Sequence, residues 1–206
     1  MLERAKAATR YERWTAVEYA RFADDLVILV DSHPRQQWLR QAVEKRLREE
    51  LAKLQVEVNE EKSRKVDLEQ GESFGFLGFE FRRIRNRRGR WMPLLLPKGK
   101  KRTELLGKLK EIFRSSRSQP VGGVIEKINP ILRGWVQYCA IGHASRCFSY
   151  IRDWVEKKIR RHLARACQRR GFGWKRWGRE WLYKTMGLFS EYRVSYRPSN
   201  SAVAPV

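Results

Sequence analysis

The positive charge of this chain is confined to its last three fifths. Residues 1–79 contain 14 Lys and Arg against 15 Asp and Glu, so they are nearly neutral. Residues 80–206 contain 31 Lys and Arg against 8 acids and account for the whole formal net charge of +22. A segment this cationic repels itself unless a polyanion neutralises it. The distribution predicts two parts with different tasks, and a polyanionic partner for the second part.

Tryptophan alternates with basic residues near the C-terminus, in Trp174-Lys175-Arg176-Trp177 and again in Arg179-Glu180-Trp181. Base stacking beside phosphate contact is typical of nucleic-acid binding. An anionic membrane surface is a second candidate partner, and a solvated basic surface over core tryptophans is the third interpretation. A membrane span is excluded, because no run of about 18 uncharged apolar residues exists.

The cysteines and histidines do not have the spacing of a zinc site or of a disulfide framework. Each stands singly in the sequence: Cys139, Cys147, Cys167, His33, His143 and His162. Residues 1–13 are charged and have no apolar stretch like that of a secretion signal. We therefore expect a reducing, cytoplasmic setting and structural or surface roles for the histidines.

The first part of the chain shows strand and helix patterns in alternation. Two β-prone runs, residues 19–23 and 26–30, flank Asp24-Asp25 and predict a hairpin with both aspartates at its tight turn. After Pro34, apolar residues recur every three or four positions and predict a helix across a sheet face. Its stripe is Leu39, Val43, Leu47, Leu51 and Leu54, widened by Trp38 and Ala42. Further strands are expected at 56–58, 66–68 and 74–81.

The second part begins with arginine and then becomes helical. Residues 82–90 contain six arginines and predict a β-arm that reaches Trp91 and Met92. Pro93 and Pro97 predict a boundary. Helices are expected from Thr103, from Pro120 with a break or kink near Asn129 before Pro130, from Ser145, and over 174–186. A tail from Pro198 is expected to be disordered. The fold class is therefore α+β, with a mixed part over about 92 residues and a helical part after it.

The acidic pair is the sharpest candidate for chemistry. Two carboxylates at a hairpin tip can bind a divalent cation, and oxygen-only ligands favour Mg²⁺. The same pair is also common at β-turns for conformational reasons, since Asp bonds its own backbone there. On the residue pair alone, both interpretations stay open.

The order of several motifs resembles one known family. Phe22-Ala23-Asp24-Asp25 is followed by the amphipathic helix, by Asn59-x-x-Lys62-Ser63, by Phe76-Leu77-Gly78-Phe79, and by a helical segment over 128–135. This series, over residues 1–195, resembles the later palm motifs and the thumb of group II intron-encoded reverse transcriptases, also called maturases. Phe22 stands where that family normally has tyrosine, which removes one hydroxyl.

The resemblance implies a fold and a set of site residues. Residues 1–92 would be a partial palm with a short antiparallel sheet, 93–197 an all-α thumb or maturase bundle (domain X), and 198–206 a tail. Asp24 and Asp25 would bind Mg²⁺ in the polymerase site, and Lys62 would lie near the incoming nucleotide, unless it is a solvated loop lysine. Phe76 to Phe79 would be the primer-grip hairpin, where Gly78 would let a nucleic-acid backbone approach. Basic residues of the helical part would contact RNA or template–primer: Arg133, Lys157, Lys158, Arg160, Arg161, Arg165, Lys175 and Arg176.

Other residues of these motifs have structural expectations. Asn59 would fix its turn, the alternating phenylalanines would be core, and Asn129-Pro130 with Trp135 would shape and pack a helix. Single-stranded bases would stack on exposed aromatics such as Trp174 or Trp177.

The sequence departs from the family in one serious way. The polymerase site of the family needs a third aspartate from an earlier palm strand, and a fingers region before it. The acids before Asp24 are Glu3, Glu12 and Glu18, and none lies in an apolar strand. Two carboxylates on one turn cannot hold two Mg²⁺ ions. We therefore expect this chain alone not to polymerise DNA, and to be the C-terminal portion of a split, truncated or fragmentary enzyme. In the split case an upstream chain would supply the fingers and the first palm strands.

Three hypotheses for the function follow. The first is the C-terminal portion of an RNA-directed DNA polymerase that also binds group II intron RNA in splicing and mobility. The second is a non-catalytic maturase remnant that only binds intron RNA. The third is a basic RNA-binding module of other origin, in which case the ordered motifs are coincidence. Primer extension with and without the upstream segment separates the first two.

Overall fold

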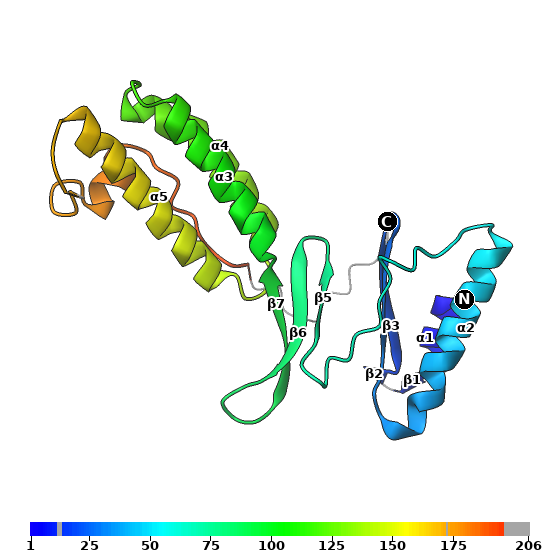
Figure 1. The fold of residues 1–206 in the computed structure, drawn as a ribbon. Helices are drawn as coiled ribbons and strands as arrows, with labels where there is room; N and C mark the ends of the chain where they lie inside the picture. Colours follow the sequence, from blue (N-terminus) through cyan, green and yellow to red (C-terminus); the bar gives the residue numbers. More distant parts are fainter. Residues whose placement is uncertain (12–13, 172, 196–206) are drawn as a thin grey trace. The chain divides into compact units, whose positions relative to one another are not determined.

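The computed structural model describes residues 1–11, 14–171 and 173–195, and its chain divides into two compact units. Unit 1 is Met1–Val66 and unit 2 is Asp67–Val206 (Figure 1). Unit 2 holds 31 of the 45 Lys and Arg but only 11 of the 23 acids, so it carries nearly all of the net charge. Small antiparallel sheets and several helices confirm the α+β class.

Unit 1 is a β-hairpin covered by helices. Strands β3 (Val17–Phe22) and β4 (Asp25–Val30) pair antiparallel, and a 3₁₀ turn η1 (Pro34–Gln36) leads into α2 (Gln37–Lys53). The other elements are α1 (Leu2–Ala8), β1 (Arg10–Tyr11) and β2 (Trp14–Thr15). The core joins hairpin and helix through Ala16, Val17, Leu39 and Val43. The predicted hairpin and its covering helix are confirmed.

The other face of the hairpin is apolar and open. Side chains alternate along a strand, so Phe22 and Leu29 point away from the face that carries Val17. Phe22 is 63% exposed and Leu29 is 46% exposed. The stripe on α2 is also narrower than predicted, since Trp38 and Leu54 are exposed. A two-stranded hairpin has room to cover only the Leu39–Val43 face of the helix.

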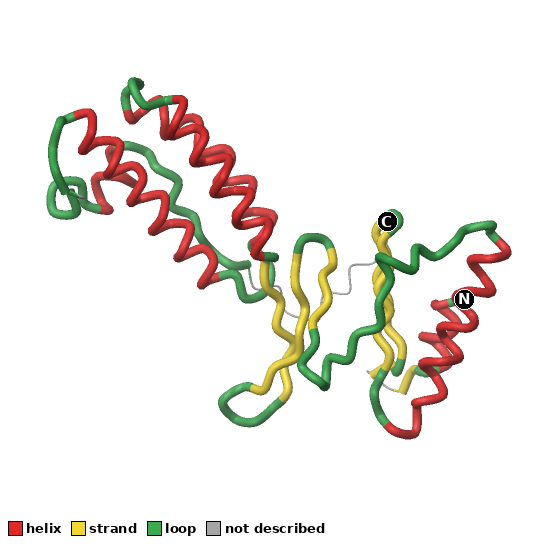
Figure 2. The backbone as a smooth tube through the Cα atoms, viewed as in Figure 1, coloured by secondary structure: helices red, strands yellow, loops and turns green. Residues whose placement is uncertain are grey.

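Two of the predicted strands are wrong. Residues 56–58 and 66–68 lie in the long connection between α2 and β5, drawn green in Figure 2. A strand needs a neighbour for its backbone N–H and C=O groups, and no described strand pairs with either segment. The alternation of valines alone could not supply that partner.

Unit 2 begins with a three-stranded antiparallel sheet in the order β5-β6-β7. Its strands are β5 (Ser73–Phe76), β6 (Phe79–Arg85) and β7 (Trp91–Pro97). The predicted single strand over 74–81 is wrong, because the chain turns at Leu77-Gly78, where both residues have positive φ (+46° and +78°). Two consecutive positive φ values make the hairpin turn whose twist matches its strands.

The prolines expected at a boundary lie inside β7. Pro93 and Pro97 are paired with Arg83 and Phe79 of β6, and β7 is an edge strand. An edge strand tolerates proline because one side of its backbone has no partner to lose. The compact units divide instead at Val66–Asp67, and the palm–thumb division at residue 92 stays a prediction.

The remainder of unit 2 is a helical bundle. Its helices are α3 (Gly99–Ser115), α4 (Val121–Cys139) and α5 (Ser145–Ala166). Leu109, Ile128, Leu132, Ile151 and Ile159 are fully buried between them. The helix start expected at Thr103 is wrong, since α3 begins at Gly99 and the Thr103 hydroxyl donates back to the Gly99 carbonyl at 3.1 Å.

The chain after α5 is less helical than predicted. Residues 174–186 contain turns and one short π-helical segment, η2 (Trp181–Thr185). The segment after η2, orange to red in Figure 1, runs back along the helices to the end of α4. There the Ser195 N–H donates to the Ala140 carbonyl at 2.7 Å. The tail predicted to be disordered, from Pro198, lies outside the described residues.

Asn129 links α4 to this returning segment. Its amide donates to the Gly187 carbonyl at 2.8 Å and accepts from the Phe189 N–H at 2.9 Å. Helix α4 continues through Pro130, so the first of the two expected alternatives, a break, is wrong, and the kink stays a prediction. Trp135 packs edge-on against Phe148 with ring centroids 6.0 Å apart. The structural roles expected for Asn129 and Trp135 are confirmed.

A buried carboxylate joins α5 to the same returning segment. Glu156 is fully buried and accepts from Arg160 Nη1 at 3.0 Å, Arg179 Nε at 2.9 Å and the Tyr183 hydroxyl at 2.6 Å. Burial raises the pKa of Glu156, but the hydrogen bonds from these three partners outweigh burial, and the net pKa lies below its usual value. The ionised form is therefore the one this cluster stabilises.

Removing one partner of this carboxylate should destabilise unit 2. We expect Arg160→Ala to lower the free energy of unfolding by about 3 kcal/mol, because the buried carboxylate of Glu156 loses its fully buried counterion. Urea unfolding followed by tryptophan fluorescence measures the change. Arg165→Ala is the matched control on the same helix, at an exposed position, and should cost less than about 0.5 kcal/mol. Equal losses in the two variants would contradict the role given to Arg160.

Candidate nucleic-acid interface

The acidic pair lies at the tip of the β3–β4 hairpin, as predicted, but only one of the two residues is in the turn. Ala23, with φ +49°, and Asp24 are the central turn residues, and Asp25 begins β4 opposite Phe22. Arg21 Nε donates to the Ala23 carbonyl at 3.1 Å and closes the turn. Both carboxylates are exposed and form no hydrogen bond or ion pair with another described residue.

The donor type at this tip fits Mg²⁺, but the number of donors does not. Carboxylate oxygens are the ligands that Mg²⁺ prefers. Among the described residues, however, no group of three or more His, Cys, Asp or Glu side chains is placed to hold a metal ion. Asp24 and Asp25 by themselves therefore do not complete a two-metal centre.

The Asn59–Ser63 motif is an exposed turn in unit 1. The Asn59 side chain accepts from the Lys62 N–H at 3.1 Å, and its carbonyl accepts from the Ser63 N–H at 2.9 Å. The expectation that Asn59 fixes this turn is confirmed. The ammonium group of Lys62 is exposed, and its role near a nucleotide stays a prediction.

Gly78 has a local reason to be glycine. Its φ of +78° belongs to the turn between β5 and β6, where a side chain would be strained. The same turn is held to α4 by the Tyr138 hydroxyl, which donates to the Leu77 carbonyl at 2.6 Å. The turn explains the residue type, and close approach of a nucleic acid stays a prediction.

A cluster of four cations spans helices α3 and α5. Lys158 lies with its ammonium 5.0 Å from the centroid of Trp154. Burial, and then the charges of Arg161, Lys110 and Arg165, lower the pKa of Lys158. Like charges close enough to depress a pKa repel one another, and a bound polyanion would relieve that repulsion. We call Lys110, Lys158, Arg161 and Arg165 the α3–α5 cluster.

A basic hollow follows α5. It is open, measures about 640 Å³, and is lined by Trp174, Gly173 and four cations: Arg169, Arg170, Lys175 and Arg176. Trp174 is 46% exposed, and the guanidinium of Arg160 lies beneath its ring, 4.1 Å from the centroid. An indole backed by a fixed cation, with exposed cations around it, can stack a base and bind its phosphate.

Two residues predicted to contact nucleic acid are buried instead. Arg160 is 1% exposed, and its donors are taken by Glu156 and by the Trp177 carbonyl at 2.9 Å. Trp177 is 9% exposed, and its ring lies so close to Gly173 that an added Cβ there would clash at 2.2 Å. The predictions for Arg160 and Trp177 are wrong because the segment after α5 folds back over this face of the helix.

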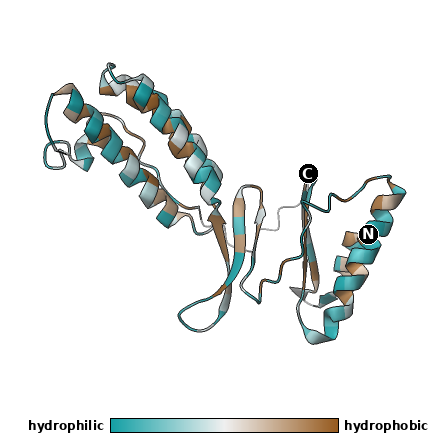
Figure 3. Cartoon of the chain, in the orientation of Figure 1, coloured by the Kyte–Doolittle hydropathy of each residue, from teal (hydrophilic) through white to brown (hydrophobic). Residues whose placement is uncertain are grey.

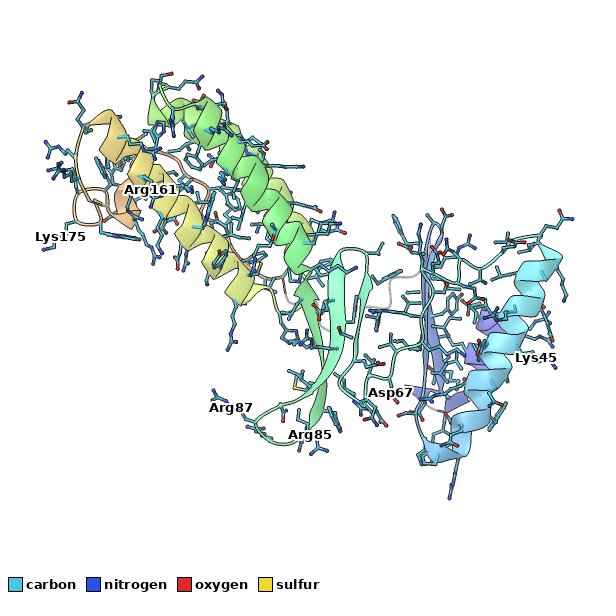
Figure 4. All side chains as sticks on the ribbon, in the orientation of Figure 1. Lys45, Asp67, Arg85, Arg87, Arg161 and Lys175 are labelled. Atoms are coloured by element: carbon cyan, nitrogen blue, oxygen red, sulfur yellow. The ribbon has the colours of Figure 1, made fainter. Side chains whose placement is uncertain are left out.

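The other predicted basic residues are accessible. Arg133, Lys157, Arg161, Arg165, Lys175 and Arg176 are exposed, and Lys158 is half-buried. Arg161 and Lys175 lie toward the same end of unit 2 in Figure 4. Their contact with nucleic acid stays a prediction. The sequence analysis missed Lys110, Arg169 and Arg170, for which the only signal was their charge.

The contacts described for the histidines and cysteines are structural, and none of them points to a catalytic or metal-binding role. His162 Nε2 lies 2.9 Å from the Gln119 carbonyl, His143 Nδ1 accepts from the Leu95 N–H, and His33 Nδ1 accepts from the Arg35 N–H. Burial raises the pKa of Cys139 to about 12, so this thiol is held in its unreactive form. None of the helices in the described ranges is long and apolar enough to cross a membrane.

Comparison with known families gives a match within the helical part. Residues 102–183 match the family described as "Group II intron, maturase-specific domain". The match covers α4, α5, most of α3 and the first part of η2, and it contains both the α3–α5 cluster and the basic hollow. No curated protein matches the sequence. This match supports the C-terminal region of a group II intron maturase over these residues, in agreement with the resemblance drawn from the sequence motifs.

Proposed function

We propose that unit 2 binds folded group II intron RNA through the α3–α5 cluster and the basic hollow, and so assists splicing and mobility of the intron. The maturase-specific domain supports maturase function and intron RNA binding in general. The observation that carries the specific proposal is the basic hollow, in which four cations surround the 46% exposed ring of Trp174 and the Arg160 guanidinium lies 4.1 Å from its centroid. Beside it, burial and then the repulsion of three neighbouring cations lower the pKa of Lys158. Phosphates placed along the cluster would replace that repulsion with attraction.

The two parts of the surface would read RNA differently. The α3–α5 cluster offers charge alone, so it would follow the backbone of a helix by shape. The hollow adds the exposed indole of Trp174, which would stack on an unpaired base. Folded intron RNA presents both helices and unpaired loops, so one surface can use both modes.

Replacing Trp174 should separate stacking from charge. We expect Trp174→Ala to weaken binding of single-stranded RNA by about 1–3 kcal/mol, without changing the dependence of affinity on salt. Lys175→Ala and Arg176→Ala should each reduce the slope of log affinity against log salt by about 1, because each removes one phosphate contact. Fluorescence anisotropy with labelled RNA at several salt concentrations measures both quantities.

Trp38→Ala is the control for this experiment. Trp38 is also exposed, at 63%, but it lies on α2 in the nearly neutral unit 1. If both tryptophan variants bind RNA as the unchanged chain does, the hollow is not a base-stacking site. If the unchanged chain binds a transcribed group II intron no better than a neutral polymer, the proposed function fails.

A second candidate function is a share in RNA-directed DNA polymerisation. The maturase-specific domain relates the chain to reverse transcriptases, and the exposed acidic tip of the β3–β4 hairpin favours a palm-like role. In this proposal Asp24 and Asp25 hold Mg²⁺ together with a third carboxylate from an upstream segment, and Lys62 lies near the nucleotide. Template–primer would then be a partner in addition to intron RNA.

Primer extension tests the second candidate. We expect no extension by this chain alone, and extension when a segment carrying fingers and the earlier palm strand is supplied on a separate chain. Asp24→Asn should abolish the extension but leave RNA affinity unchanged, since the charge that binds RNA lies in unit 2. Salt-sensitive RNA binding without extension in either mixture favours a non-catalytic maturase remnant.

A further inference from the structure

The β6–β7 hairpin ends in an arginine-rich loop that lies outside the maturase-specific match. From Arg82 to Arg102 the chain carries ten Lys and Arg and not one acid, and six of these are arginines between 82 and 90. Figure 3 shows the outer end of the hairpin in the colour of hydrophilic residues and the base of β7 as hydrophobic. Figure 4 places Arg85 and Arg87 at this outer end. The charge is therefore concentrated at the tip.

The tip loop is held by one asparagine. The Asn86 side-chain oxygen accepts from the N–H groups of Arg88 and Arg90, both at 2.9 Å. The Asn86 N–H donates to the Arg90 carbonyl at 2.8 Å, and the Gly89 N–H donates to the Asn86 carbonyl at 2.9 Å. These bonds use only backbone groups of the arginines. The loop is thus ordered, while the side chains of Arg87, Arg88 and Arg90 remain exposed.

Trp91 holds two more arginines next to the loop. The guanidinium carbons of Arg83 and Arg85 each lie 4.8 Å from the centroid of its ring. A guanidinium that stacks on a ring uses its flat face and keeps its in-plane N–H donors for other partners. Arg83 uses one N–H donor in an ion pair with Glu69, with Nη1 and Oε1 2.8 Å apart. Arg85 has no carboxylate partner within the described ranges, so its fork is available for a phosphate.

The base of the hairpin is fixed to the helical bundle. The His143 N–H donates to the Leu95 carbonyl at 2.8 Å, and the Leu95 N–H donates back to His143 Nδ1 at 3.3 Å. The ring of Phe79 stacks on Tyr138 with centroids 5.7 Å apart. These contacts join β6 and β7 to α4 and to the α4–α5 loop. A cationic tip on an anchored base loses little freedom when it binds.

We propose that the β6–β7 hairpin is a second RNA-binding element, an arm whose tip binds the phosphate backbone of double-stranded RNA. Arg87, Arg88 and Arg90 would contact phosphates as exposed cations, and Arg85 would bind one phosphate through its fork. The arm would recognise shape and charge rather than bases, because two guanidinium groups already lie against its tryptophan. This inference rests on the proposed function, since it assumes that the chain binds RNA.

The arm and the α3–α5 cluster lie at different ends of unit 2. Figure 4 shows Arg85 and Arg87 far from Arg161 and Lys175 within this unit. One folded RNA that reaches both places would be bound at two points, and its second contact would form without a further loss of translational freedom. Loss of the arm should therefore weaken binding of a long folded RNA more than binding of a short duplex.

The test removes the tip charges from the full chain. Arg87→Ala, Arg88→Ala and Arg90→Ala, combined, should lower affinity for an RNA stem-loop about 10- to 100-fold at moderate salt and reduce the salt slope by about 2–3. The loop should keep its structure, because its hydrogen bonds use Asn86 and backbone groups, and circular dichroism checks this. Trp91→Ala should show part of the same loss, because Arg85 is then no longer held in place.

A charge-matched variant is the control. Arg35→Ala, Lys45→Ala and Arg46→Ala, combined, remove three exposed cations from unit 1. A smaller loss in this control than in the tip variant supports the arm. Equal losses overturn it and leave the proposed function standing, because net charge alone then explains the effect. Binding that depends on the tip for duplex DNA but not for duplex RNA also overturns it. If neither the unchanged chain nor any variant binds RNA, the proposed function itself fails.

Discussion

One buried carboxylate lies at the centre of the most cationic part of the molecule. Glu156 accepts hydrogen bonds from Arg160, Arg179 and Tyr183, and these partners lie on two stretches of chain that are separate in the sequence. Unit 2 carries 31 Lys and Arg, so carboxylates that can pair with them are few. Loss of one partner from the Glu156 network would leave a buried charge without its counterion. The position of Trp174 depends on the same cluster, because its ring rests on the guanidinium that Glu156 holds.

The remaining cations of unit 2 are distributed so that folding and binding use different groups. Arg160 is paired with Glu156 inside the fold. Lys158, on the same helix two residues earlier, is half-buried near other cations, and burial followed by their charges lowers its pKa. A protein that paired all of its cations internally would have little free positive charge with which to bind a polyanion. The separation between a buried ion pair and an exposed, repelling cluster is therefore what allows the unit to be both folded and strongly basic.

Local patterns in the sequence predicted the elements but not the contacts between distant segments. The helical stripe with Ile151, Val155 and Ile159 was sufficient for α5, and the β-prone runs around Asp24-Asp25 were sufficient for the hairpin. Glu156 and Arg160 had the spacing of a helical ion pair, yet their burial depends on the segment after residue 173, which no periodicity reveals. For the same reason Trp177 was expected at the surface.

The failures over strands have a related cause. The valines at 56 and 58 have the right alternation but no strand to pair with, and the phenylalanines of 74–81 continue their alternation across a turn. Phe74 and Phe81 are stacked across the hairpin at 4.9 Å, so a pattern that resembled one strand came from two. From the sequence alone we identified the acidic pair, the exposed tryptophan and most of the cations of the candidate site. The grouping of the cations into a cluster and a hollow depends on the packing of α3 and α5 and could not be predicted.

Asn86, which closes the loop at the end of β6, fixes the course of the loop without using the side chains that project from it. Because Asn86 binds backbone atoms, the residues that project from the loop are exchangeable without a change in its course. A library randomised at positions 87, 88 and 90 should consist mainly of folded proteins that differ in the ligand they bind. The loop is therefore a natural place to select for binding of a chosen RNA, with the scaffold left unchanged.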